Sequence, residues 1–211
     1  MEIGACHVHL EKFDSMETEE ILEYIKDGRD DRIFAIAELI RRGIELQKIF
    51  DVTKITVFFL EKIKNIVDFE KTVKENAMDI NVLKEAKKMG FSDKYIGKLW
   101  GKTESDIYLL RKENKIYPAY KMIDTAPVEN ERYVPYFYST YNDKKVTYKD
   151  PNHKEKKIIV LGSGPIRIGQ GVEFDYSTVH AVTTIKKAGY EAIIINNNPE
   201  TVSTDFTTSD K

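Results

Sequence analysis

Apolar residues recur at helical spacing through the first two-thirds of the chain. In residues 31–42, Ile33, Ile36, Ala37 and Ile40 stand at positions i, i+3, i+4 and i+7, on one face of a helix. Further helices are predicted over 45–52, 56–69, 83–89, 92–100 and 103–114. No segment before residue 156 alternates in the manner of a strand, so this part is predicted to be helical.

Capping residues support these helices. Asp30 or Asp31 is a candidate N-cap for the first helix, and Gly43 is placed to follow its end. Thr103 with Asp106 resembles a capping box, with Asp in place of the preferred Glu.

A weak internal repeat appears when Gly43 is laid over Gly90. Each copy then reads as a helix, a glycine turn, a short helix, a second turn and a longer helix. The aligned pairs are Ile49 with Ile96, Thr56 with Thr103, Leu60 with Ile107, and Ile63 with Leu110. We interpret the repeat as a duplicated packing unit.

The pattern changes twice after this region. Residues 117–154 are rich in tyrosine and contain Pro118, Pro127, Pro135 and Pro151, which block long helices and predict an extended connector docked on a domain surface. From residue 157, a buried strand (157–161), a glycine loop (162–171), a helix (173–188) and a second strand (191–195) follow. In that helix, packing is expected from Val179, Val182, Thr183 and Ile185. These elements predict a parallel β-α-β unit.

Composition narrows the class of protein. Apolar residues make up 41% and charged residues 32% of the 211 residues, which is typical of a globular chain with a solvated surface. The net charge of −2 does not favour a dedicated nucleic-acid or membrane-surface protein. The chain has no run of roughly 18 apolar residues to span a membrane. Cys6 is its single cysteine, so the cytoplasm is the expected compartment.

The glycine loop GSGPIRIGQG fits neither common nucleotide motif. A dinucleotide site needs a third glycine where Arg167 stands, and an acidic residue where Asn196, Asn197 and Asn198 stand. A P-loop needs a lysine where Gln170 stands. Two interpretations remain open: a tight turn only, or backbone N–H groups that face an anion or polar substrate.

Three other features carry alternative chemistry. Residues 84–121 hold ten Lys or Arg against five Asp or Glu, and two short helices across a turn suggest a helix-turn-helix that binds DNA. Cys6, His7 and His9 offer metal ligands but lack a fourth partner at a recognised spacing. Four apolar residues are candidates for a self-association surface, with core packing favoured for each: Phe50, Phe58, Phe59 and Trp100.

Longer stretches resemble a known family. LGSGPIRIGQGVEFDYSTVHA followed by NNNPETVSTDFTTSD resembles the large subunit of carbamoyl-phosphate synthase, at the opening of the second of its two synthetase halves. DRIFAIAELIRRG, FLEKIKNIVDFE and GFSDKYIGKLWGKTESDIYLLRKENKIYPAYKMIDT are similar to the helical oligomerisation domain that connects those halves.

The resemblance implies a mainly α fold followed by a partial Rossmann-like pre-ATP-grasp segment. We expect a helical oligomerisation domain over 1–125, a connector over 126–155 and a truncated pre-ATP-grasp β-α-β over 156–211. A substrate- or anion-facing loop would contain Gly162, Gly164, Arg167, Gly169, Gln170 and Gly171, and a polar loop would contain Asn198, Glu200 and Thr201.

The implied parent enzyme is an ATP-dependent ligase that makes carbamoyl phosphate for pyrimidine and arginine biosynthesis. ATP, Mg²⁺ and K⁺ would bind to its ATP-grasp domains, so this chain is expected to hold no cofactor, metal or catalytic residue and to be inactive alone. Expected partners are the rest of the large subunit, a small glutamine amidotransferase subunit and further copies of the chain. Neither nucleic acid nor membrane is expected. The alternative is a helix-turn-helix regulator with an α/β effector domain.

Overall fold

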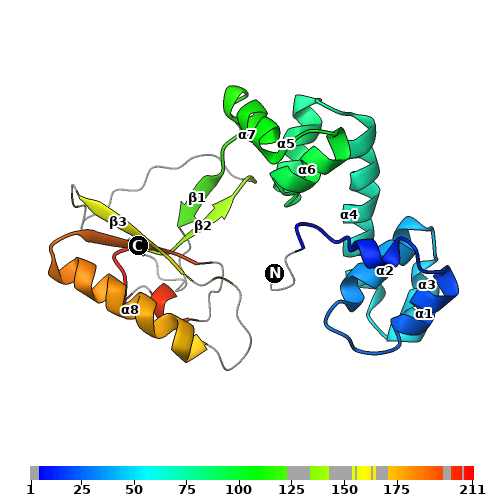
Figure 1. The fold of residues 1–211 in the computed structure, drawn as a ribbon, viewed down its shortest axis with the longest axis horizontal. Coiled ribbons are helices and arrows are strands. Elements are labelled where there is room, and N and C mark those ends of the chain that lie inside the picture. Colours follow the sequence, from blue (N-terminus) through cyan, green and yellow to red (C-terminus); the bar gives the residue numbers. More distant parts are fainter. Residues whose placement is uncertain are drawn as a thin grey trace, which may run out of the picture. The chain divides into compact units, whose positions relative to one another are not determined.

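The computed structural model contains two compact units, which are described separately (Figure 1). The first ends at Tyr117 and the second begins at Pro118. The structure describes residues 5–122, 134–142, 154, 156–162, 164, 171–196, 201–205 and 207–211, with the backbone alone at 171, 172 and 174. The predicted boundary at residue 125 lies outside the described residues, so the three-part division stays a prediction.

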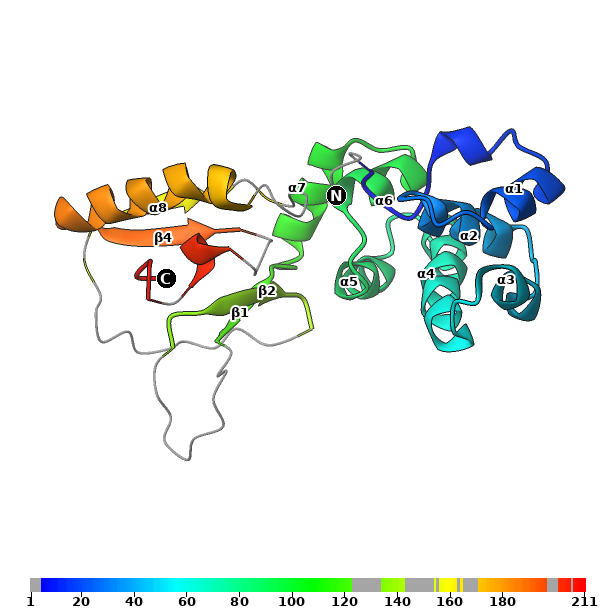
Figure 2. The ribbon, with the colours of Figure 1, turned by 90° about the horizontal axis from the view of Figure 1, so that it is seen from below.

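The first unit is helical, and its longest helix, α4, runs through it. The elements are η1 (Glu11–Phe13), α1 (Thr18–Tyr24), α2 (Arg32–Arg41), α3 (Leu46–Thr53), α4 (Val57–Glu75), α5 (Ile80–Lys88), α6 (Asp93–Trp100) and α7 (Glu104–Glu113). Helix α4 contacts α2 and α3, which precede it in the chain, and also α5 and α6, which follow it. Figure 2 shows this order from below, with α4 between the two groups.

The internal repeat is confirmed by the helix boundaries. Helix α3 begins at Leu46 and α6 at Asp93, while α4 begins at Val57 and α7 at Glu104. These starting points are separated by the same 47 residues that separate Gly43 from Gly90. The second copy therefore repeats the first element by element.

The turns and their buried neighbours also match between the copies. Gly43 and Gly90 have positive φ angles of 78° and 89°, which glycine adopts without steric cost. The next turn is left-handed in both copies, at Lys54 in the first and Gly101 in the second. The aligned side chains Ile49, Ile96, Leu60 and Ile107 are all buried.

The predicted capping box of the second copy is confirmed, and the structure adds a side-chain cap at the start of α6. Ser92 accepts a hydrogen bond from the backbone N–H of Tyr95 through its side chain at the start of α6. Thr103 and Asp106 form a reciprocal capping box at the start of α7, which satisfies two backbone donors that the helix itself leaves free. These polar ends fix where each helix begins.

The buried surface of α2 is wider than the single apolar face that the sequence predicts. The predicted Ile36, Ala37 and Ile40 are buried, but Ile33 is 42% exposed, so its placement in the stripe is wrong. Phe34, Ala35 and Leu39 are buried in addition. The helix contacts η1, α1 and α4, and neighbours on several sides cover more of its surface than one apolar face would present.

The four aromatic candidates have different surroundings. Trp100 is buried and donates its ring N–H to the carbonyl oxygen of Val73 at 2.6 Å. Phe50 is half-buried against the core cluster of α1–α4. Phe58 and Phe59 are exposed, so the expectation of core packing is wrong for these two.

Two short strands correct the prediction that none precedes residue 156. Strand β1 (Ala119–Met122) pairs antiparallel with β2 (Phe137–Thr140), with Ala119 opposite Thr140. Of these strand residues, Ala119 alone is buried. A strand of four residues with so little burial carries too weak an alternation to be recognised in the sequence.

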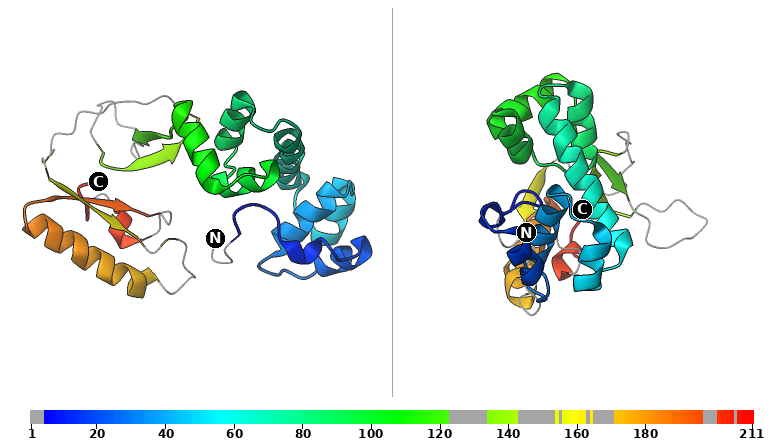
Figure 3. Two further views of the ribbon diagram at one scale, coloured as in Figure 1. Left: turned by 45° about the horizontal axis from the view of Figure 1, so that its top comes forward. Right: turned by 90° about the vertical axis from the view of Figure 1, so that its right-hand side faces the viewer.

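The predicted parallel pairing is confirmed, but the prediction that the strand over 157–161 is buried is wrong, because four of its five residues, including Ile159 and Leu161, are exposed. Strand β3 (Lys157–Leu161) pairs with β4 (Glu191–Ile195) in a parallel register, and α8 (Gly171–Lys187) connects them. The left view of Figure 3 shows α8, in orange, along one side of the strands. A 3-10 turn, η2 (Val202–Thr204), contacts both α8 and β4.

Packing of α8 follows the prediction in part. Val182 is fully buried, and Val179 and Ile185 are half-buried. Thr183 is exposed, which corrects its assignment to the packed face, and its hydroxyl donates to the carbonyl of Val179 at 2.9 Å. Among the described helices, none is long and apolar enough to cross a membrane.

Candidate functional site

The candidate site lies where the two parallel strands end. Gly162 follows β3 and Asn196 follows β4, so both lie at the carboxyl edge of the pair. The backbone N–H of Gly162 donates to the carbonyl of Ile195 at 2.8 Å, which continues the pairing one step beyond β3. Ligands of open α/β sheets bind at this edge.

Asn196 connects the glycine loop with the polar loop. Its side-chain oxygen accepts a hydrogen bond from the backbone N–H of Gly164 at 3.2 Å, and its amide nitrogen lies 3.5 Å from Oγ1 of Thr201 as a donor. A Cβ atom on Gly162 would lie 2.6 Å from Cγ of Asn196. Glycine at 162 therefore leaves the space that the Asn196 carboxamide occupies.

Hydroxyl groups cluster on the other side of Asn196. Oγ1 of Thr201 lies 3.3 Å from Oγ of Ser203 and 3.3 Å from Oγ1 of Thr204. The backbone N–H of Ser203 donates to Oδ2 of Asp175 at 2.7 Å, and Asp175 is buried near the start of α8. This bond ties η2 to the end of α8 that follows the glycine loop.

The structure brings three of the predicted site residues together. Gly162, Gly164 and Thr201 meet through Asn196, and Gly171 begins α8. Five predicted residues lie outside the described residues: Arg167, Gly169, Gln170, Asn198 and Glu200. The anion-facing role of the two loops stays a prediction.

Sequence reasoning missed the organising roles of Asn196 and Asp175. Asn196 stands where a dinucleotide fingerprint would have an acidic residue, but the sequence gives no sign that its carboxamide turns back to the glycine loop. Asp175 lies beyond the first turn of α8 and accepts its hydrogen bond from Ser203, 28 residues further along the chain, so no local signal in the sequence indicated it.

A buried carboxylate lies at the opposite end of β4 from this site. Glu191 contacts Nζ of Lys157 at 3.2 Å and Nζ of Lys211 at 2.8 Å, and accepts a hydrogen bond from the backbone N–H of Lys154. Burial would raise the pKa of Glu191, but these donors lower it. Glu191 is thus a paired charge that fixes the start of the strand.

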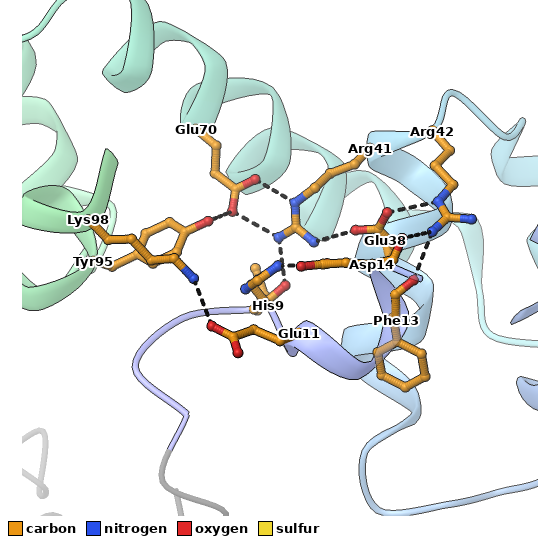
Figure 4. Close-up of polar contacts among 11 residues, drawn as sticks. His9, Glu11, Phe13, Asp14, Glu38, Arg41, Arg42, Glu70, Tyr95 and Lys98 are labelled. Atoms are coloured by element: carbon orange, nitrogen blue, oxygen red, sulfur yellow. Dashed lines mark hydrogen bonds and ion pairs between the residues drawn. The ribbon is translucent and has the colours of Figure 1, made fainter. Parts of the chain in front are cut away.

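The helical unit contains a second polar cluster, centred on Glu70 of α4 (Figure 4). The Arg41 guanidinium donates to both carboxylate oxygens of Glu70, at 2.7 and 2.8 Å. The hydroxyl of Tyr95 donates to the same carboxylate at 2.8 Å, and Nε2 of His7 lies 2.8 Å from it. Residues from α2, α4, α6 and the N-terminal segment therefore meet at one carboxylate.

Two arginines also hold the N-terminal segment by its backbone. Arg41 donates to the carbonyl of Val8 at 2.7 Å, and Arg42 donates to the carbonyl of Met16 at 2.7 Å. Arg42 also donates to the carbonyl of Phe13 at 2.8 Å (Figure 4). The segment is therefore attached to the end of α2 by charge-assisted hydrogen bonds.

The pKa values of this cluster indicate a structural role. Burial would raise the pKa of Glu70, but contacts with His7 and Arg41 outweigh it and lower the pKa to about 2. Burial and the nearby Glu70 charge raise the pKa of Tyr95 above its ordinary value. Near neutral pH Glu70 is ionised and Tyr95 is protonated, so this pair is a fixed clamp rather than a site of proton transfer.

The candidate metal ligands point to different partners. His7 contacts Glu70, and Nε2 of His9 lies 2.9 Å from Oδ1 of Asp14. Among the residues that the structure describes, no group of three or more His, Cys, Asp or Glu could hold a metal ion.

Some of the basic residues in the predicted DNA-binding segment have internal partners. Asp93 contacts Nζ of Lys87 at 2.8 Å and accepts hydrogen bonds from the Arg111 guanidinium, and all three side chains are largely buried. Burial would raise the pKa of Asp93, but Arg111 and Lys87 lower it. Lys87 and Arg111 therefore stabilise the second helical copy, which leaves less of the local positive charge for phosphates.

These features define a class of protein: a duplicated helical domain followed in the same chain by a parallel β-α-β unit. Comparison with known families makes this specific. Residues 1–115 match the carbamoyl-phosphate synthetase large chain, oligomerisation domain, and residues 154–211 match the carbamoyl phosphate synthase preATP-grasp domain. The first match covers more than half of the chain, which therefore belongs to the carbamoyl-phosphate synthetase large-chain family.

Proposed function

We propose that this chain is the linking and self-association region of a carbamoyl-phosphate synthase large subunit, together with the start of its second pre-ATP-grasp domain. The observation that carries the proposal is the order of the two matched domains, with the oligomerisation domain (1–115) preceding the preATP-grasp domain (154–211) in one chain. That order is expected of a segment that connects two synthetase halves.

The parent enzyme would form carbamoyl phosphate from bicarbonate, glutamine-derived ammonia and ATP, in the cytoplasm, for pyrimidine and arginine biosynthesis. Its ATP, Mg²⁺ and K⁺ would bind to ATP-grasp domains, and neither matched domain is described as one. Phosphoryl transfer depends on metal ions that bridge the phosphates. The chain alone would thus supply structure rather than turnover.

The helical unit suits the linking role. Its two copies are joined through α4, and the Glu70 cluster connects α2, α4, α6 and the N-terminal segment. Such a unit would hold flanking domains in a fixed register. Its partners would be the rest of the large subunit, a small glutamine amidotransferase subunit and further copies of the chain.

An activity assay tests the division of labour. The purified chain is incubated with ATP, Mg²⁺, K⁺, bicarbonate and ammonia, and carbamoyl phosphate is measured beside an intact synthase as the positive control. We expect no product from the chain and product from the intact enzyme. Turnover by the chain alone would contradict the proposal.

Sedimentation velocity across a range of protein concentrations tests the self-association role. We expect a sedimentation coefficient that rises with concentration as oligomers form. A single monomeric species at every concentration would remove self-association from the proposed function.

A further inference from the structure

Helix α4 begins with two adjacent phenylalanines that face solvent. Phe58 is 56% exposed and Phe59 is 60% exposed, and no other phenylalanine of the described residues is exposed. The two rings lie edge to face with centroids 5.4 Å apart, and Nζ of Lys62 lies 4.9 Å from the centre of the Phe58 ring. Exposed aromatic rings in contact with one another are typical of an interaction surface.

The duplicated copy provides an internal comparison for this pair. In the second copy, Ser105 and Asp106 occupy the positions that correspond to Phe58 and Phe59. The helix there still begins at the equivalent residue, and the next side chain, Ile107, is buried just as Leu60 is. The helix start therefore does not require aromatic rings at these two positions.

The first copy also lacks a side-chain cap at the start of α4. Asp106 closes the capping box with Thr103, whereas Thr56, the equivalent N-cap of α4, makes no side-chain capping bond. A capping residue typically stabilises a helix by about 1 kcal/mol. The exposed ring of Phe59 occupies the position where the carboxylate of Asp106 stabilises the second copy. This difference indicates that Phe59 has a role other than folding.

We propose that the exposed pair of Phe58 and Phe59 is the apolar centre of the surface through which two copies of this chain associate. This inference rests on the proposed function, because the matched family model is an oligomerisation domain. In a two-fold symmetric contact the same patch on each copy faces its counterpart, so an exposed aromatic pair meets an identical pair.

Size and charge fit this occupant. With about 150–250 Å² available to each phenylalanine, the exposed parts of the two rings supply about a fifth to a third of the ~800 Å² that a stable dimer buries per partner. The exposed Glu61 and Lys62 follow the pair by one turn of α4, so both charge signs border the rings. A symmetric approach can therefore place unlike charges opposite one another around the rings.

The test exchanges the pair for its counterparts in the second copy. The double variant Phe58→Ser with Phe59→Asp restores a capping-box pattern with Thr56, so it is expected to fold. The matched control is Tyr108→Ser with Leu109→Ser, which removes two apolar side chains of α7 that are 50% and 52% exposed. Circular dichroism verifies helicity, and sedimentation equilibrium gives the dissociation constant of each protein.

We expect the dissociation constant of the Phe58 and Phe59 double variant to rise about 30-fold or more, which corresponds to ~2 kcal/mol. The control should match the wild type. The conservative variant Phe58→Leu with Phe59→Leu should retain most of the association, because it keeps the surface apolar.

Two results would overturn the inference, and only one of them would also contradict the proposed self-association role. If the wild type associates and the serine–aspartate variant associates equally well, the surface lies elsewhere and the proposed function stands. If the wild-type chain is monomeric at every concentration, both the surface and the self-association role fail. In that case another segment of the large subunit or a different protein is the partner of the two rings.

Discussion

Replacing Glu70 with glutamine tests whether the buried carboxylate stabilises the helical unit. Glu70 is largely buried, and its pKa is lowered from 4.5 to about 2 in the folded chain. A displacement of that size corresponds to about 3 kcal/mol, at about 1.4 kcal/mol per pKa unit. Near neutral pH the Glu70→Gln variant should be less stable by about that amount, because it leaves Arg41 without its bidentate partner.

The dependence on pH has a definite sign. Because the folded-state pKa is lowered, the contribution of Glu70 is fully present above about pH 4.5 and is lost as the pH falls toward 2. About 2 kcal/mol of it should be gone by pH 3. The stability difference between wild type and Glu70→Gln should shrink accordingly, since glutamine does not titrate.

The single tryptophan makes the assay specific. Trp100 lies in the helical unit, so urea unfolding followed by tryptophan fluorescence reports on that unit. The matched control is Glu75→Gln on the same helix, where the exposed carboxylate lies 3.9 Å from Nζ of Lys71 and should contribute less than about 1 kcal/mol. A Glu70→Gln difference below about 1 kcal/mol at neutral pH, or one that is constant with pH, would refute the linkage argument.

Three further predictions concern packing, capping and the candidate site. Gly97→Ala should destabilise the helical unit by about 1–3 kcal/mol in urea unfolding, because its Cβ would lie 2.7 Å from the carbonyl oxygen of Lys102. Thr103→Ala should cost about 1 kcal/mol in the same measurement, through loss of the capping box. Asp175→Ala should speed hydrogen exchange at the Ser203 amide by about tenfold or more, because that N–H loses its carboxylate acceptor.

Controls distinguish these effects from general damage. Gly28→Ala places a Cβ where no other atom lies within 4 Å and should leave stability nearly unchanged, as should Ser105→Ala at an exposed position of α7. Equal losses in these controls would show that any substitution in the unit is costly. Unchanged exchange at Ser203 would mean that the bond to Asp175 does not hold η2.

Local signals predicted much of the helical unit. Thr103 and Asp106 predict a helix start from residues only three positions apart. Gly43 and Gly90 predict turns that need a positive φ. The repeat also followed from one alignment of the two glycines. Such features are readable because the residue and its structural consequence lie next to each other in the chain.

Features that depend on distant partners were missed. Phe58 and Phe59 look like core residues in the sequence because both are aromatic. The sequence at these positions does not show that the neighbouring helices leave both rings exposed. Asn196 meets Gly164 across 32 residues, and Arg41 meets Glu70 across 29. The strands β1 and β2 escaped recognition because four largely exposed residues carry too little pattern.

The arginines at the end of α2 affect how freely the N-terminal segment can change. Arg41 and Arg42 bind the backbone carbonyls of Val8, Phe13 and Met16 rather than their side chains. Because every residue has a carbonyl, this anchoring makes no demand on the side chains at those positions. Substitutions at Val8 and Met16 that keep the side chain apolar should therefore preserve the course of the segment over the helices, whereas His7 and His9 contact carboxylates through their side chains.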